Sequence, residues 1–137
     1  MPRSKPSVLL LEDDPMVLLE MRRDLEELGW RVDHIATCID GATKLARSAD
    51  IDLAILDINV EGVPSYPVAE ILKRRGIPLI FITGFIGERI RTNYPDASIL
   101  SKPYSFVDLQ HTVRQTLLTA PAFLSTRDRA SASVKRH

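Results

Sequence analysis

Five apolar segments recur along the chain, and all but the second of them end at or just before a polar residue. They cover residues 7–11, 30–35, 51–57, 77–83 and 97–101. The segment 51–57 is apolar almost throughout, which is typical of a strand buried on both faces of a parallel sheet. Polar residues interrupt the segment 30–35, which favours an edge strand. The pattern therefore predicts one sheet with residues 51–57 near its centre.

Apolar residues at helical spacing follow the first predicted strand. Asp14 and Pro15 form a good helix start, because aspartate caps free backbone N–H groups and proline suits the first turn. Gly29 supplies a C-terminal stop. The apolar stripe of this predicted helix consists of Val17, Met21, Leu25 and Leu28.

Further helices are expected over residues 40–49, 68–75, 84–94 and 105–118. Asp40 is the predicted N-cap of the first of these. Its apolar side consists of Ala42, Leu45, Ala46 and Ala49. The apolar side of the last consists of Phe106, Leu109, Val113 and Leu117. Residues 59–67 predict a loop, because they contain Gly62, Pro64 and Pro67.

Strands that alternate with helices predict an α/β fold with a parallel sheet and helices on both faces. A chain of 137 residues suits one such domain. We expect this domain over residues 7–119, after an N-terminal extension of residues 1–6. Residues 120–137 are basic and lack an apolar period, which predicts a disordered tail.

The composition narrows the class of protein. The formal net charge is zero, so no overall field draws the chain to nucleic acid or to a membrane. The single cysteine, Cys38, cannot form an internal disulfide, and we expect it to be a buried or half-buried apolar residue. No secretory signal and no membrane span are recognisable. These features predict a cytoplasmic protein.

Polar side chains follow the predicted strands at one edge of the sheet. They are Glu12, Asp13, Asp57, Thr83 and Lys102. Carboxylates brought together there repel by roughly 4 kcal/mol per pair, at about 4 Å and an effective dielectric near 20. A divalent cation relieves this repulsion, and an all-oxygen ligand set suits Mg²⁺. The sequence therefore predicts a magnesium site at this edge.

The same residue types suit phosphoryl transfer. Asp57 would be the nucleophile and would form an acyl phosphate. Mg²⁺ and Lys102 would neutralise charge on the transferred group, while the Thr83 hydroxyl would bond one of its oxygens. Taken singly, each residue also has an ordinary structural explanation, such as a turn-starting Asp57 or a solvated Lys102. Their occurrence together at one sheet edge favours a role in phosphoryl transfer.

With these residues in place, residues 7–118 resemble a response-regulator receiver domain of bacterial two-component signalling. The resemblance implies a flavodoxin-like (βα)5 doubly wound sheet with strand order 2-1-3-4-5. It implies Mg²⁺ bound by the acidic pair Glu12 and Asp13, by Asp57 and by the backbone carbonyl of Asn59. It also implies phosphorylation by a sensor histidine kinase and a cis peptide bond before Pro103.

Residues 78–85 further resemble a group of single-domain receivers from alphaproteobacteria nicknamed FAT GUY, which carry Phe-Ala-Thr-Gly here. In this chain Ile82 replaces the alanine, and Gly84 completes the predicted phosphate-binding set with Thr83 and Lys102. The relatives imply a stand-alone regulator and a kinase of the HWE type. Asn59 and Phe85 lie where relatives tune hydrolysis of the phosphoryl group.

Two departures from the family pattern are visible. Ile99 stands where most receivers have an aromatic switch residue, so the usual coupling of Thr83 to a rotating ring is not expected. Glu61 stands where many receivers have proline, four residues after the phosphoacceptor, and predicts an altered loop.

Three functions are compatible with this set of residues. The first is a phosphorylated signalling switch, whose partner face would comprise the fourth helix, fifth strand and fifth helix. The second is a Mg²⁺-dependent phosphohydrolase of the haloacid-dehalogenase type, prompted by Asp57-Ile58-Asn59, although Asn59 cannot serve as its acid or base. The third is a bare scaffold that has lost phosphorylation. A phosphate sink without an output partner is a further alternative.

Overall fold

The computed structural model describes residues 5–84, 94 and 97–119. Within them, five parallel strands form one sheet in the order β2-β1-β3-β6-β7. The strands are β1 (Ser7–Leu11), β2 (Arg31–Ala36), β3 (Leu53–Asp57), β6 (Leu79–Thr83) and β7 (Ser98–Ser101). Since β6 and β7 are the fourth and fifth strands of this sheet, the order is the predicted 2-1-3-4-5. The flavodoxin-like fold is thus confirmed, with β2 at an edge.

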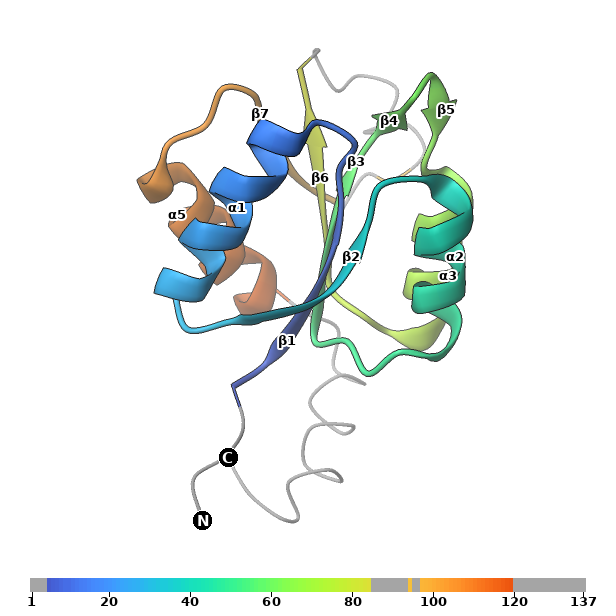
Figure 1. The fold of residues 1–137 in the computed structure, drawn as a ribbon. Coiled ribbons are helices and arrows are strands. Elements are labelled where there is room, and N and C mark those ends of the chain that lie inside the picture. The colour runs from blue at the N-terminus through green and yellow to red at the C-terminus, as the bar shows by residue number, and fades with distance from the viewer. Residues whose placement is uncertain (1–4, 85–93, 95–96, 120–137) are drawn as a thin grey trace, which may run out of the picture.

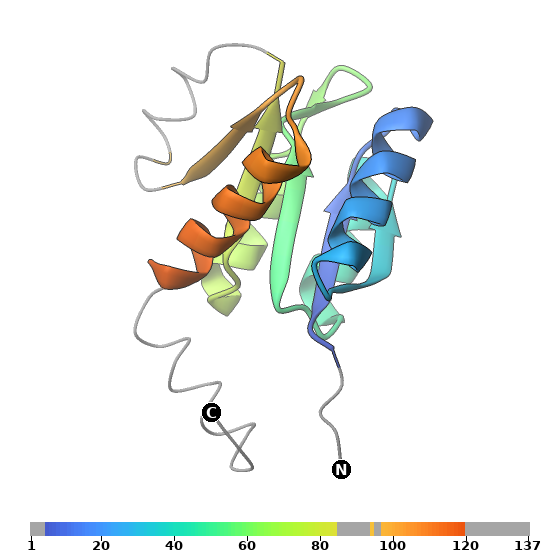
Figure 2. The ribbon, with the colours of Figure 1, turned by 90° about the vertical axis from the view of Figure 1, so that its left-hand side faces the viewer.

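Helices cover both faces of the sheet. The helices are α1 (Pro15–Glu27), α2 (Ile39–Ser48), α3 (Tyr66–Arg75) and α5 (Phe106–Leu118). Helices α1 and α5 lie on one face, and α2 and α3 lie on the other (Figures 1 and 2). The doubly wound arrangement places the carboxyl ends of all five strands at the same edge. No described helix is both long enough and apolar enough to span a bilayer.

The two central strands, β1 and β3, supply most of the core. All five residues of each are buried, as predicted for residues 51–57. Alternate side chains enter opposite clusters, so that Leu56 packs towards α2 and α3 while Ile55 packs towards α1 and α5. Full burial of such a side chain contributes about 1.5–3 kcal/mol. The strand ends are therefore fixed in place by apolar packing on both faces.

Helix α1 begins and ends at the capping residues that the sequence predicts. The Asp14 side chain accepts hydrogen bonds from the N–H groups of Met16 and Val17. Gly29, with φ +98°, follows the last turn. Helix α5 begins at a capping box, in which Ser105 and Asp108 each accept a hydrogen bond from the other's backbone N–H.

Three side-chain predictions are wrong. Helix α2 starts at Ile39 after Cys38, so Asp40 lies in its first turn instead of capping it. Cys38 is exposed, because it precedes the helix at the end of a strand–helix connection. In α5, Thr116 is buried and Leu117 is 39% exposed, since the Thr116 hydroxyl bonds Ser98 Oγ at 2.7 Å.

The predicted loop over residues 59–67 contains regular structure. Strands β4 (Asn59–Val60) and β5 (Val63–Pro64) form a small antiparallel hairpin, and α3 already begins at Tyr66. The hairpin lies beyond the end of β3 (Figure 1). The predicted helix at 84–94, apart from its two terminal residues, and the predicted tail at 120–137 lie outside the described residues.

Candidate functional site

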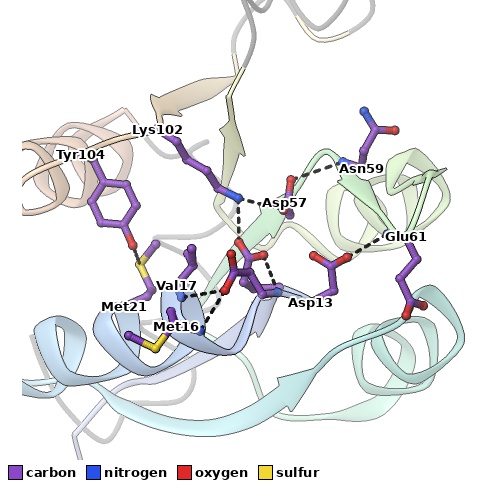
Figure 3. A network of polar contacts seen from close by, with 11 residues as sticks. Asp13, Met16, Val17, Met21, Asp57, Asn59, Glu61, Lys102 and Tyr104 are labelled. Atoms are coloured by element: carbon purple, nitrogen blue, oxygen red, sulfur yellow. Dashed lines mark hydrogen bonds and ion pairs between the residues drawn. The ribbon is translucent and has the colours of Figure 1, made fainter.

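The predicted polar side chains lie at the carboxyl ends of four strands, and Figure 3 shows Asp13, Asp57 and Lys102 near one another. Asp57 ends β3 and is 8% exposed. Glu12 and Asp13 follow β1, and Lys102 follows β7. Thr83, the last residue of β6, is 4% exposed. Strands β1, β3 and β6 are buried almost throughout and fix the three carboxylates and Thr83, whereas Lys102 follows the partly exposed strand β7.

Lys102 links two of the carboxylates. Its Nζ lies 3.1 Å from Asp57 Oδ2 and 3.1 Å from Glu12 Oε1. Burial opposes the positive charge of Lys102, but these two carboxylates outweigh it and raise the pKa of Lys102 above its ordinary value. The lysine is therefore a cation held directly beside Asp57.

Glu12 is the most deeply buried of these groups, with none of its surface exposed. Its Oε2 accepts a hydrogen bond from the Asp14 N–H at 3.0 Å. Burial, with a smaller contribution from the charge of Asp57, raises the pKa of Glu12 despite the opposing effects of that hydrogen bond and of Lys102. Because burial and the charge of Asp57 disfavour the ionised form of Glu12, a cation bound nearby would stabilise that form.

Asp13 and Asp57 each accept a hydrogen bond from the segment that follows β3. Asp13 Oδ2 accepts from the Glu61 N–H at 3.0 Å, and Asp57 Oδ1 accepts from the Asn59 N–H at 3.4 Å. The side chain of Asn59 is exposed and points away from the carboxylates (Figure 3). The β4–β5 hairpin therefore borders the cluster through its backbone.

The three carboxylates fit a magnesium ion. One oxygen from each of Glu12, Asp13 and Asp57 lies within 4.8 Å of the others. The donors are all oxygen, as Mg²⁺ prefers, and the single ammonium group of Lys102 leaves an excess of negative charge among them. A cation bound there would neutralise the charge that develops on a transferred phosphoryl group.

The phosphate-binding residues predicted from the sequence lie at the same edge. The carbonyl of Thr83 accepts the Lys102 N–H at 2.8 Å, which joins the ends of β6 and β7. Gly84 is exposed, and a side chain there would meet no atom of the described chain within 4 Å. The peptide bond between Lys102 and Pro103 is cis. Phe85 lies outside the described residues.

Ile99 is half-buried and packs against the cluster on the α2 and α3 side. The sequence did not predict the aromatic group that lies in the same cluster. The Tyr94 ring stacks on Tyr66 at 5.6 Å between centroids and meets Phe81 edge-on at 5.4 Å. The available sequence signal was the position of Phe81, two residues before Thr83. Because side chains alternate along a strand, the Phe81 side chain points to the opposite face of the sheet from the residues on either side of it.

The Tyr94 hydroxyl donates a hydrogen bond to Glu70 Oε2 at 2.6 Å. Burial and the neighbouring Glu70 charge raise the pKa of Tyr94 far above its ordinary value, so the hydroxyl stays protonated at physiological pH. Lys73 Nζ lies 5.6 Å from the centre of the same ring. These contacts join residue 94 to helix α3.

Comparison with known proteins agrees with the fold. The family model of the response regulator receiver domain matches residues 8–114. The chain belongs to this family, whose members act in two-component systems. Among curated relatives, the transcriptional activator protein IrlR of Burkholderia pseudomallei is 33% identical over 125 residues, which cover 87% of this chain and 53% of IrlR. The transcriptional regulatory protein CusR of Escherichia coli is 30% identical over 122 residues, covering 85% and 53%.

The chain thus spans about half the length of these curated relatives. Solved structures are also similar. SdrG from Sphingomonas melonis Fr1 has a TM-score of 0.74 and 29% identity, with 85% of this chain and 99% of SdrG covered. The response regulator PhyR from Brucella abortus has a TM-score of 0.74 and 26% identity, with 93% and 52% covered.

Proposed function

We propose that this chain is a phosphorylated signalling switch, in which Asp57 accepts a phosphoryl group from a sensor histidine kinase. The observation that carries the proposal is the position of Asp57. Its carboxylate ends a buried strand, lies beside the ammonium group of Lys102 and shares a cluster with Glu12 and Asp13. A nucleophile, a fixed cation and a set of metal ligands therefore meet at one point.

In the proposed step, an Asp57 oxygen attacks phosphorus and the phosphorus–nitrogen bond of a phosphohistidine breaks. The electron pair of that bond returns to the imidazole, and an acyl phosphate remains on Asp57. Lys102 neutralises the added negative charge, because its Nζ already lies 3.1 Å from Asp57 Oδ2. The Thr83 hydroxyl and the Gly84 backbone bind phosphoryl oxygens in this proposal. Glu12, Asp13, Asp57 and the Asn59 carbonyl would hold Mg²⁺, which would supply further charge neutralisation.

The output of the switch is a change in protein binding. We propose that the partner face comprises β7, α5 and the segment between β6 and β7. From the resemblance of residues 78–85 to the FAT GUY group, we propose that the regulator works with a kinase of the HWE type in the cytoplasm. In this reading the chain is not a turnover enzyme.

Incubation with Mg²⁺ and a small-molecule phosphodonor tests the proposal. The intact protein should gain the mass of one phosphoryl group, and Asp57→Asn should not. The control is Asp33→Asn, which removes an exposed carboxylate on β2 that pairs with Arg31. This control should be labelled like wild type. Labelling that persists in Asp57→Asn would contradict the proposal, and continuous hydrolysis of a generic phosphoester would favour the phosphohydrolase.

A further inference from the structure

The turn of the β4–β5 hairpin has an unusual backbone for its sequence. Two residues, Glu61 and Gly62, connect the paired Val60 and Val63, and their φ angles are +54° and +79°. Positive φ at both turn positions is the geometry of a tight type I′ hairpin. Glycine adopts it readily, whereas glutamate rarely does. Something in the fold therefore holds Glu61 in this conformation.

Two contacts fix the turn. Val60 is 1% exposed and packs in the core cluster under α2 and α3. At the other side, the Glu61 N–H donates its hydrogen bond to Asp13 Oδ2 at 3.0 Å, across 48 residues of sequence. The Glu61 carboxylate points away from Asp13 (Figure 3). The contact therefore belongs to the main chain of residue 61 and not to its side chain.

This hydrogen bond acts on a residue of the acidic cluster. Asp13 is half-buried, and one of its oxygens is within reach of the oxygens of Glu12 and Asp57. An aspartate carboxylate rotates about a soft bond, so an N–H that binds one oxygen sets the direction of the other. Groups that orient a metal ligand in this way change metal affinity by roughly 10- to 100-fold when they are removed.

We infer that the Glu61 main-chain N–H is a positioning group for the magnesium site, and that the β4–β5 hairpin thereby sets the Mg²⁺ affinity of this receiver. The inference rests on the proposed function, because it assigns Asp13 to the metal. It also gives a physical meaning to the replacement of proline at position 61. Proline has no N–H and fixes φ near −65°, so it can supply neither the donor nor the turn.

The test compares Mg²⁺ affinities by calorimetric titration of metal-free protein. Glu61→Ala keeps the N–H and removes the carboxylate, so its dissociation constant should stay within about twofold of wild type. Glu61→Pro should bind Mg²⁺ roughly tenfold more weakly or worse. Asp13→Asn serves as the reference for loss of a ligand.

Because Glu61→Pro also conflicts with the turn, a second variant isolates the hydrogen bond. An α-hydroxy acid at position 61 in the Glu61→Ala background replaces the N–H by an ester oxygen and leaves φ unrestricted. It should show the same roughly tenfold loss of affinity relative to Glu61→Ala. Its melting temperature in EDTA should fall below that of Glu61→Ala only by the few degrees expected for one lost hydrogen bond, which separates a metal effect from a folding effect.

Equal Mg²⁺ affinity in the ester variant and in Glu61→Ala overturns the inference. Labelling of Asp57 by a phosphodonor is measured in the same preparations, so the two proposals fail separately. Normal labelling with an unchanged affinity in the ester variant removes only the role of the hairpin. A wild-type protein that neither binds Mg²⁺ nor is labelled removes both.

Discussion

The sheet interior and its carboxyl edge differ in how burial affects stability. In the interior, apolar side chains of β1 and β3 are buried on both faces, and every such contact stabilises the fold. At the edge, a few ångströms further along the same strands, Glu12 and Asp57 are buried together with their charges. Burial of charge costs free energy even when partners are present.

The difference shows which part of the molecule supports the other. Buried carboxylates that repel one another persist only where the surrounding structure fixes them. Here Asp57 is the last residue of a strand whose other residues are all buried, and Glu12 directly follows another such strand. The apolar packing of the interior therefore offsets the free-energy cost of burying the carboxylates at the edge.

The largest effect is expected in the interior. Ile55→Ala removes a fully buried side chain from β3 and should lower the free energy of unfolding by about 2–5 kcal/mol. Leu118→Ala is the control, because Leu118 is 73% exposed and its truncation should change stability by about 0.5 kcal/mol or less. Chemical denaturation of both variants measures the difference. Equal losses in the two variants would contradict the assigned core.

A smaller effect is expected from the cation at the edge. Lys102→Gln removes the ammonium group between Glu12 and Asp57, and the metal-free protein should lose about 1–3 kcal/mol of stability. Added Mg²⁺ should raise the melting temperature more in this variant than in wild type, because the ion then replaces the missing charge. Thermal unfolding with Mg²⁺ and with EDTA measures both effects.

Lys44→Gln, at an exposed position on α2, is the matched control for loss of a positive charge. It should leave the stability and the Mg²⁺ response unchanged. If Lys102→Gln behaved like this control, the ion pairs at the edge would have no energetic role.

The aromatic group beneath the edge provides an intermediate case. Tyr94→Phe keeps the ring contacts with Tyr66 and Phe81 but loses the hydrogen bond to Glu70. Because Glu70 is exposed, the loss should be about 0.5–1 kcal/mol. Tyr94→Ala also removes the ring and should cost several times more. A Tyr94→Phe variant as unstable as Tyr94→Ala would show that the ring contacts contribute little.

The smallest expected effect is a pH dependence from Glu12. Its pKa is raised above the ordinary 4.5 by burial, so the folded protein holds this proton at pH values where the unfolded chain has lost it. The associated stability is present below pH 4.5 and is lost as the pH rises through the raised pKa. In EDTA, wild type should therefore lose stability relative to Glu12→Gln as the pH rises through this range. A flat difference would contradict the buried charge.

The same contrast explains what could be predicted from the sequence. The apolar segments give the strands, and a parallel sheet places their ends at one edge, so the meeting of Asp57 with Lys102 follows from topology. Side-chain choice within helices is harder, because a shift of one residue decides whether Thr116 or Leu117 is buried. That choice depended on a hydrogen bond to Ser98, which lies in another element.

The hairpin and Tyr94 could not be predicted for a related reason. Gly62 indicates a turn, but the positive φ of Glu61 depends on a contact with Asp13 far away in the sequence. Likewise, the packing of Tyr94 depends on the chain path that returns it to α3. Local patterns carry information about burial and turns, whereas these contacts arise from tertiary structure.

The most direct test of the central claim is to locate the phosphoryl group. After incubation with a phosphodonor, hydroxylamine converts an acyl phosphate to a hydroxamate, which peptide mass spectrometry can assign to one residue. We predict modification at Asp57 that requires Mg²⁺ and is lost in Asp13→Asn. Modification at another residue, or equal modification at Asp57 in EDTA, would contradict that claim.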